Sequence, residues 1–332
     1  MNVNIVLSLV AVVVLGALAF LGGSAPALQG VFGILIPYIA FVMFLGGFIW
    51  RIMKWAKSPV PFRIPTTCGQ QKSLSWIKHD KIENPTTGIG VVIRMALEIL
   101  TFRSLFRNTK AKIIGDRISY ELELWLWLFA LVFHYSFLAV LVRHMRFFLE
   151  PVPVCITFLE AVDGFFQIGL PIVLMSGVLL FAAVAFLFLR RIATPTLRYA
   201  SLAADYFPLF LIMTIAGTGM YMRYFLRVDV VAVKELTMGL ATLHPSIPAN
   251  IDPFLFVHLF LVCVLFVYFP FSKLMHAGGI FFSPTRNMAN NSRIKRHINP
   301  WNPDLPFVTY EKYENAFREK MIEAGIPVEK ES

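Results

Sequence analysis

The sequence contains few charged residues and few cysteines. Only 15% of its 332 residues are charged, against about 25% in an average soluble domain, so charged side chains cannot cover a soluble globule of this size. The three cysteines, Cys68, Cys155 and Cys263, form no C-x-x-C pair. This excludes a disulfide scaffold, a cysteine zinc site and a self-contained iron–sulfur cluster.

Apolar residues take the place of the missing charge. The chain is 57% hydrophobic, and its mean hydropathy is +0.68. The net charge of +10 does not indicate a nucleic-acid partner, because such a partner needs a basic face on a soluble fold. The composition therefore predicts a multi-pass membrane protein.

Six apolar runs approach the length of about 20 residues that a membrane-spanning helix needs. They are Val3–Leu21, Val31–Trp50, Leu122–Val142, Phe165–Leu189, Tyr206–Phe225 and Phe254–Met275. Ser24–Ala27 resembles the cleavage site of a secretory signal. The first four residues, Met1–Asn4, carry no Lys or Arg, however, and the run is long for a signal peptide, which favours an uncleaved helix.

The distribution of basic residues predicts the topology. If the N-terminus is cytoplasmic, 25 of the 30 Lys and Arg residues fall in cytoplasmic segments, namely residues 51–117, 190–198 and the stretch from Lys273 onward. Such a bias is the usual mark of the cytoplasmic side. We therefore expect both termini in the cytoplasm and the protein in the cytoplasmic membrane.

The fold class that we expect is an all-α integral membrane protein with six transmembrane helices. Two further helices are expected on the cytoplasmic side: an amphipathic one over Gly90–Phe106, lying under the membrane, and a mixed-charge one over Phe307–Ala324. The expected parts are an extra N-terminal helix, the second span, a cytoplasmic loop, a four-helix core and a cytoplasmic tail, at residues 1–29, 30–55, 56–119, 120–280 and 281–332.

Four of the seven histidines lie in or beside two of the apolar runs. His134 and His144 belong to the third run, and His258 and His276 to the sixth. An imidazole in lipid needs partners for both ring nitrogens, and carboxylates such as Glu123 lie only at the ends of the spans, away from the membrane interior. One such histidine is readily explained by an interhelical hydrogen bond, but four on two helices favour axial ligation of haem iron.

The depth of each histidine in the membrane predicts which ones pair. The third run leads outward and the sixth leads inward, so His134 and His276 lie toward the cytoplasm, and His144 and His258 lie toward the outside. The spacings of ten and eighteen residues correspond to rises of about 15 Å and 27 Å. Helix tilt and a kink at Pro270 would have to absorb this difference.

The two histidine spacings and their order resemble the nitrate reductase gamma subunit superfamily of dihaem cytochromes b. The resemblance covers about residues 30–280 and implies a five-helix dihaem bundle, to which this chain adds one N-terminal helix. It implies two haem b groups, with His134 and His276 on the inner iron and His144 and His258 on the outer iron. It also implies menaquinol as the electron donor.

Three stretches outside the core resemble the DsrM branch of that superfamily, the membrane subunits of the sulfite-reduction-associated DsrMKJOP complex. They are Thr67–Lys72, Ser283–Asn287 and His297–Pro303. The heterodisulfide reductase membrane subunits are close relatives and remain an alternative, as does the gamma subunit of another quinol-linked reductase.

The outer end of the predicted core offers polar groups for a quinol. Quinol oxidation needs a hydrogen-bond partner and a proton acceptor, and the residues that we favour are Arg143 and Asp163, with Glu160 nearby. An ordinary interfacial role explains each of these charges equally well.

The inner end has no redox group of its own, so an electron path that ends there requires a partner. The resemblance implies a cytoplasmic iron–sulfur subunit similar to heterodisulfide reductase, DsrK-like, together with other Dsr subunits. The basic loop and Asn299–Pro303 are candidate docking surfaces. We therefore expect menaquinol oxidation outside and electron transfer inward, with the reverse direction in a sulfur-oxidising host. A histidine-relay proton transporter and a structural anchor are the alternatives.

Overall fold

The structure is a computed structural model that describes residues 2–60, 63–64, 69–164, 171–295 and 306–329. Six helical segments within these residues are long and apolar enough to cross a membrane, as the sequence predicts. They are α1 (Val3–Ser24), α2 with α3 (Pro26–Gly30 and Ile36–Ala56), α6 (Leu124–His144), α8 (Met175–Ala193), α10 (Ala203–Tyr221) and α12 (Pro253–Tyr268).

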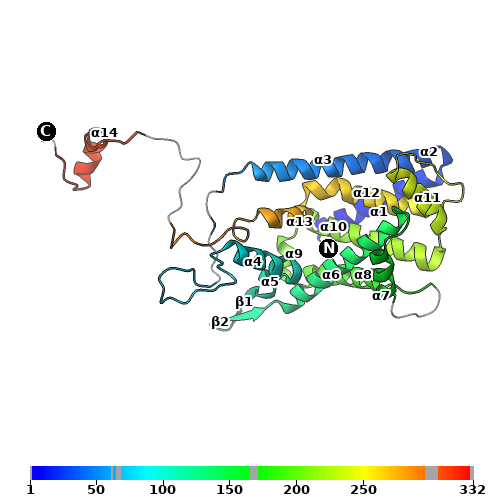
Figure 1. Cartoon of the computed structure of the whole chain (residues 1–332), viewed down its shortest axis with the longest axis horizontal. Helices are drawn as coiled ribbons and strands as arrows, with labels where there is room; N and C mark the ends of the chain where they lie inside the picture. The colour runs from blue at the N-terminus through cyan, green and yellow to red at the C-terminus, as the bar shows by residue number, and fades with distance from the viewer. Residues whose placement is uncertain (1, 61–62, 65–68, 165–170, 296–305, 330–332) are drawn as a thin grey trace.

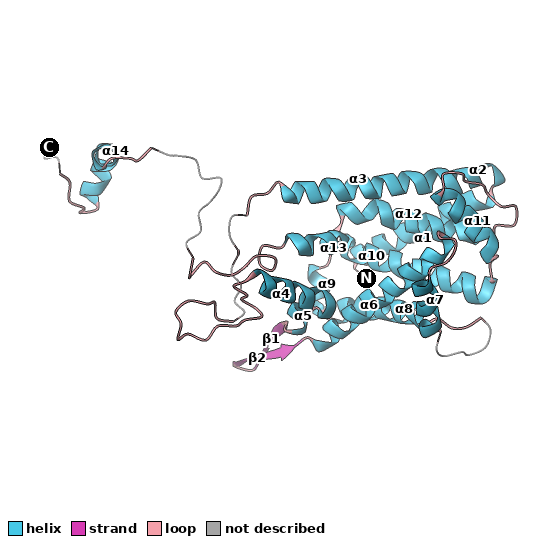
Figure 2. Cartoon of the chain, viewed as in Figure 1, coloured by secondary structure: helices cyan, strands magenta, loops and turns pink. Residues whose placement is uncertain are grey.

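Shorter elements connect these helices or follow them. The helices are α4 (Gly88–Thr101), α5 (Arg103–Phe106), α7 (Val154–Asp163), α9 (Pro195–Ala200), α11 (Val230–Ala241), α13 (His276–Gly279) and α14 (Tyr310–Glu323). Two strands, β1 (Thr109–Ile114) and β2 (Arg117–Leu122), form an antiparallel hairpin in which Ala111 pairs with Tyr120. Figure 2 shows this hairpin beside an otherwise helical chain.

Local capping explains where several helices begin. The side chain of Asp252 accepts a hydrogen bond from the backbone N–H of Phe254 at 2.7 Å, and Pro253 occupies the first turn of α12. Thr87 caps α4 in the same way through the N–H of Gly90, at 3.2 Å. These side chains satisfy N–H groups that have no partner inside the helix.

The spanning helices form one bundle along the long axis of the molecule (Figure 1). Helices α4, α5 and α13 and the β1–β2 hairpin lie at one end, which we call the basic end because residues 51–117 belong to it. Helices α7 and α11 lie at the other end, which we call the opposite end. The side chain of Asn4 donates to the carbonyl of Ser201 at 3.1 Å, so the start of α1 lies beside the start of α10.

Packing within the bundle separates the two helices that carry the histidines. Helix α6 packs on α8, whereas α12 packs on α1, α3 and α10. The contact of α1 with α12 is close, since a Cβ atom on Gly23 would lie 2.7 Å from the Cβ of Phe256. The central core comes mainly from α10 and α12 and includes Leu211 and Leu261, both fully buried.

Three features differ from the sequence expectation. The fourth span begins at Met175 rather than Phe165, because Pro171 interrupts the run and Asp163 binds the start of the new helix; residues 165–170 lie outside the described residues. The expected kink at Pro270 is a break, since α12 ends at Tyr268. Finally, the amphipathic helix is divided at Phe102 into α4 and α5.

Candidate functional site: two histidine pairs in the bundle

The first pair lies toward the opposite end of the bundle. His144 is the last residue of α6, and His258 lies in the second turn of α12. Their ring centroids are 6.4 Å apart, and the ring planes are inclined by 17°. We call these two residues the opposite-end pair. From the sequence, we expect both of them toward the outer side of the membrane.

The second pair lies at the basic end. His134 lies in the middle of α6, and His276 begins α13 after the break that follows α12. Their ring centroids are 5.8 Å apart, and the ring planes are nearly perpendicular at 84°. Ser272 in the break is extended, so the chain changes direction before His276. This break explains how His276 lies opposite His134 although the two histidine spacings, ten and eighteen residues, are unequal. We call His134 and His276 the basic-end pair.

The four imidazoles share one hydrogen-bonding pattern at Nδ1. The carbonyl oxygens of Ala130, Val140 and Lys273 lie 2.7 to 2.8 Å from Nδ1 of His134, His144 and His276, respectively. A carbonyl only accepts, so these three rings carry their proton on Nδ1. Nε2 has no hydrogen-bond partner among the described residues, and its lone pair is available to a metal.

The fourth ring, His258, is bonded to a hydroxyl. Its Nδ1 lies 2.9 Å from Oγ1 of Thr218, and that hydroxyl also lies 2.9 Å from the carbonyl of Thr214. The single hydroxyl proton of Thr218 is donated to a carbonyl, so its oxygen accepts from the Nδ1–H of His258. Such bonds fix the tautomer and the orientation of metal-ligating histidines.

The geometry of both pairs fits bis-imidazole ligation of haem iron. A metal ion about 2 Å from one nitrogen of each ring places the two ring centroids roughly 6 Å apart, close to the 6.4 Å and 5.8 Å observed. The described residues contain no group of three or more His, Cys, Asp or Glu side chains that could hold a metal ion. Iron in a porphyrin needs only two protein ligands, which is what each pair supplies.

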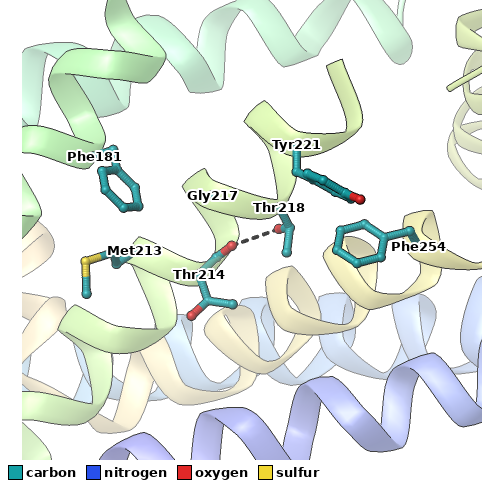
Figure 3. A pocket seen from close by; sticks show the side chains of 7 residues that line it. All are labelled: Phe181, Met213, Thr214, Gly217, Thr218, Tyr221 and Phe254. Carbon is teal, nitrogen blue, oxygen red and sulfur yellow. Dashed lines mark hydrogen bonds between the residues drawn. The ribbon is translucent and has the colours of Figure 1, made fainter. Parts of the chain in front are cut away.

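An open apolar pocket of about 370 Å³ borders Thr218, the hydrogen-bond partner of His258. Figure 3 shows its lining, which comes from α8, α10 and α12 and consists of Phe181, Met213, Thr214, Gly217, Thr218, Tyr221 and Phe254. Thr218 therefore belongs both to the cavity wall and to the hydrogen bond that orients His258. His144 and His258 are not among the lining residues, so the pocket borders the hydrogen bond of His258 rather than the space between the two imidazoles.

The two residues that the sequence suggests for a quinol, Arg143 and Asp163, bind each other. Nε of Arg143 lies 2.8 Å from Oδ2 of Asp163, and both side chains are buried. Ser176, in the first turn of α8, donates its N–H and its hydroxyl to Asp163 at 2.6 and 2.7 Å. The carboxylate thus fixes the start of α8 as well as pairing with Arg143, one residue before His144.

Glu160 also has a partner at the opposite end. Both of its carboxylate oxygens accept from Nη1 of Arg146 at 2.8 Å.

Of the three cysteines, Cys155 is exposed, Cys263 is buried, and Cys68 lies outside the described residues.

Sequence reasoning does not identify Thr218 or Phe102 as parts of the site. The ring of Phe102 lies edge-on to His134, with centroids 4.8 Å apart. Threonine and phenylalanine are ordinary residues in apolar segments. Gly219 is the one local signal near His258: a Cβ there would lie 3.2 Å from Cε1 of this ring, so α10 approaches the histidine closely at that point.

Comparison with known proteins identifies the family. Residues 87–297 match the nitrate reductase gamma subunit family. The chain is 49% identical over 286 residues to a protein of Archaeoglobus fulgidus described as an Hdr-like menaquinol oxidoreductase cytochrome b-like subunit, covering 84% of this chain and 86% of the relative. A protein of Archaeoglobus profundus with the same description is 41% identical, covering 83% and 84%. This chain is therefore a multi-pass membrane protein that belongs to the nitrate reductase gamma subunit family.

Proposed function

We propose that this chain is a menaquinol-oxidising dihaem cytochrome b. The single observation that carries the proposal is the presence of two histidine pairs at two depths of one bundle, with centroid distances of 6.4 and 5.8 Å and with Nδ1 of every ring already bonded to the protein. The opposite-end pair holds one haem and the basic-end pair holds the other. Helices α6 and α12 with α13 supply all four ligands.

The bound haems supply one-electron transfer, which no side chain of the bundle provides. The protein contributes the axial ligands, their orientation and the apolar surroundings of the bundle. Menaquinol oxidation releases two electrons and two protons, and the electrons pass singly from one end of the bundle to the other. Relatives described as cytochrome b-like subunits of a menaquinol oxidoreductase support this assignment.

We place the quinol at the opposite end, beside Arg143 and Asp163. Arg143 precedes His144 in the sequence, and its guanidinium donates to Ser176 at 2.9 Å as well as pairing with Asp163. A guanidinium can donate a hydrogen bond to a quinone oxygen, and a carboxylate can accept a proton. Asp163 also accepts two hydrogen bonds from Ser176, so the quinol would share this carboxylate with the start of α8.

The partner at the basic end is a cytoplasmic iron–sulfur subunit resembling heterodisulfide reductase. The printed description of the relatives, Hdr-like, supports this partner class. We assign the chain to the DsrM branch, with a DsrK-like partner, other Dsr subunits and a role in dissimilatory sulfur metabolism. Both termini face the cytoplasm, as the bias of 25 of 30 basic residues indicates. The candidate docking segment Asn299–Pro303 lies outside the described residues.

Purified protein in lipid nanodiscs tests the function. We expect a red preparation, a reduced-minus-oxidised spectrum of low-spin haem b, about two haems per chain, and reduction of both by a menaquinol analogue. Arg143→Gln should slow that reduction and leave the haem content unchanged. A colourless but folded protein contradicts the electron-transfer function, and equal reduction rates for the wild-type protein and this variant contradict the quinol site.

A further inference from the structure

Phe102 lies at an unusual position in the chain. It separates α4 from α5 and has φ +50° and ψ +46°, in the left-handed region that bulky L-residues rarely adopt. Its ring contacts His134 edge-on, at a centroid distance of 4.8 Å and an interplanar angle of 84°. Phe133 makes a similar contact with the same imidazole, at 4.9 Å. Two aromatic rings therefore confine His134, whose Nδ1 is held by Ala130.

The chain just before Phe102 is bound to α6 on both sides of His134. Trp127, about two turns before His134, donates from Nε1 to the carbonyl of Thr101 at 2.8 Å. The hydroxyl of Tyr135 donates to the carbonyl of Leu100 at 2.9 Å. These carbonyls lie in the last turn of α4, where no intrahelical donor remains for them. The helix that carries His134 thus fixes the end of α4 against itself.

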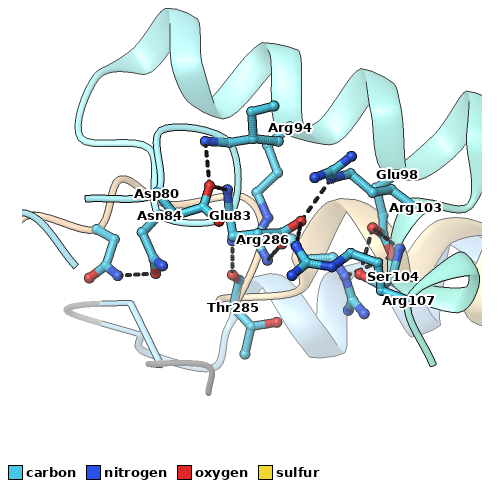
Figure 4. A network of polar contacts seen from close by, with 12 residues as sticks. Asp80, Glu83, Asn84, Arg94, Glu98, Arg103, Ser104, Arg107, Thr285 and Arg286 are labelled. Atoms are coloured by element: carbon cyan, nitrogen blue, oxygen red, sulfur yellow. Dashed lines mark hydrogen bonds and ion pairs between the residues drawn. The ribbon is translucent and has the colours of Figure 1, made fainter. Parts of the chain in front are cut away.

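A buried carboxylate holds the chain after Phe102. Oε1 of Glu83 lies 2.8 Å from Nε of Arg103 and 2.8 Å from Nη1 of Arg107, and Oε2 lies 3.6 Å from Nη2 of Arg94. Glu83 is only 4% exposed, so these attractions are weakly screened. Figure 4 shows the carboxylate among guanidiniums from both helices. We call Glu83 with its three arginines the Glu83 clamp.

A second carboxylate ties α4 to α5 directly. Oε2 of Glu98 accepts from the backbone N–H of Ser104 at 3.1 Å and from its hydroxyl at 2.7 Å (Figure 4). The chain on either side of Phe102 is therefore held by α6, by the Glu83 clamp and by Glu98. A conformation that is costly for phenylalanine is maintained by the contacts around it, which is typical of residues placed for function.

We propose that Phe102 is a positioning residue for the basic-end haem: it fixes the imidazole plane of His134 and keeps water from that side of the iron. This inference rests on the proposed function, because it requires haem at the basic-end pair. Among the described residues no phenylalanine ring covers His276, which is exposed. The basic-end haem is thus covered on the α6 side and accessible on the α13 side, from which electrons leave.

Phe102→Ala in nanodisc-embedded protein tests the proposal. Removing the ring admits water, which favours the more highly charged oxidised iron, so the midpoint potential of the basic-end haem should fall. Release of the His134 ring should also change the low-spin ferric EPR signal of that haem. The near-perpendicular rings of this pair, at 84° against 17°, should give it the more anisotropic of the two signals and so identify it.

Phe106→Ala is the matched control. Phe106 lies edge-on to Trp127, with centroids 4.9 Å apart, and within the described residues its ring contacts no histidine ring. This variant removes a ring of the same size from the neighbouring turn and should leave both EPR signals and both potentials unchanged. Equal effects of Phe102→Ala and Phe106→Ala would overturn the positioning role in favour of a merely structural one.

Two further variants keep the test decisive. Phe102→Gly relieves the left-handed backbone while still removing the ring, so it should fold at least as well as Phe102→Ala and show the same shift in potential. Glu83→Gln weakens the clamp and should shift the same haem by a smaller amount. If the wild-type protein holds two haems and none of these variants moves the basic-end signal, this inference fails; if the wild-type protein holds none, the proposed function fails.

Discussion

At the scale of single residues, the geometry of the site depends on the hydrogen bond that Nδ1 of each imidazole makes. Three of the four rings donate to backbone carbonyls within their own helix or turn, whereas His258 donates to Thr218 on another helix. When Nδ1 of a histidine donates a hydrogen bond, Nε2, the nitrogen free to bind a metal, becomes more basic. Thr218 therefore orients His258 and, in the proposed dihaem assignment, would affect the electronic properties of the iron that His258 is proposed to bind.

Thr218→Val tests this assignment, because valine preserves the shape and removes the acceptor. The net loss of one neutral hydrogen bond is about 1 kcal/mol, so the protein should fold. We expect the potential of the opposite-end haem to rise and that of the basic-end haem to stay unchanged in a redox titration. The control is Thr242→Val, because the hydroxyl of Thr242 bonds to the carbonyls of Met238 and Gly239 in α11 and Thr242 does not line the pocket beside Thr218. A shift of both haems, or of neither, contradicts the assignment.

The sequence predicts the four histidines because imidazoles are conspicuous in apolar helices, whereas their supporting residues are not. Thr218 and Phe102 belong to types that are common in such segments, and their roles depend on contacts 40 and 32 positions away in the chain. The pairing of Arg143 with Asp163 likewise depends on how α7 returns to α6. Single-sequence reasoning identifies these two charges but not that they neutralise each other.

At the scale of elements, hydropathy predicts all six spans and misses what depends on local geometry. It does not predict the β1–β2 hairpin, whose strands are exposed in the structure. One face of that hairpin carries apolar residues such as Ile113 and Ile118, and the other carries the Lys110–Glu121 pair. The period-two pattern is short and lies directly beside a hydrophobic span, so it is easily read as the start of that span.

The segment that supports the Glu83 clamp depends on pH through Asp80. Its carboxylate accepts the backbone N–H groups of Ile82 and Glu83 at 3.0 Å each. Burial acts to raise the pKa of Asp80, but those hydrogen bonds and the charges of Arg107 and Arg103 together lower it below its ordinary value. Because folding lowers this pKa, the stabilisation is complete above the ordinary pKa of an aspartate and is lost as pH falls through the lowered value.

Hydrogen exchange of residues 80–107 measures this effect. In the wild-type protein, protection should be constant near neutral pH and should decrease below about pH 4. Asp80→Asn should lower the protection at neutral pH and reduce its change with acidification, since the amide carries no titrating charge. Identical pH profiles for the two proteins would show that Asp80 does not stabilise this segment.

At the scale of the whole molecule, the bundle separates α6 from α12 and holds two histidine pairs between them. The family match begins at residue 87, yet α1 and α3 precede it and both pack on α12. The N-terminal helices therefore support the helix that supplies His258. Two histidine pairs at two depths of one apolar bundle are the arrangement that the proposed electron transfer across a membrane requires.

The pairing of the histidines is the central claim, and the most direct test is the haem spectrum of four single variants. Each histidine is replaced by alanine in turn, and the remaining low-spin haem is measured by redox-difference spectroscopy and EPR. His144→Ala and His258→Ala should lose one spectral component, and His134→Ala and His276→Ala should lose the other. Loss of the same component in His144→Ala and His276→Ala would contradict the account.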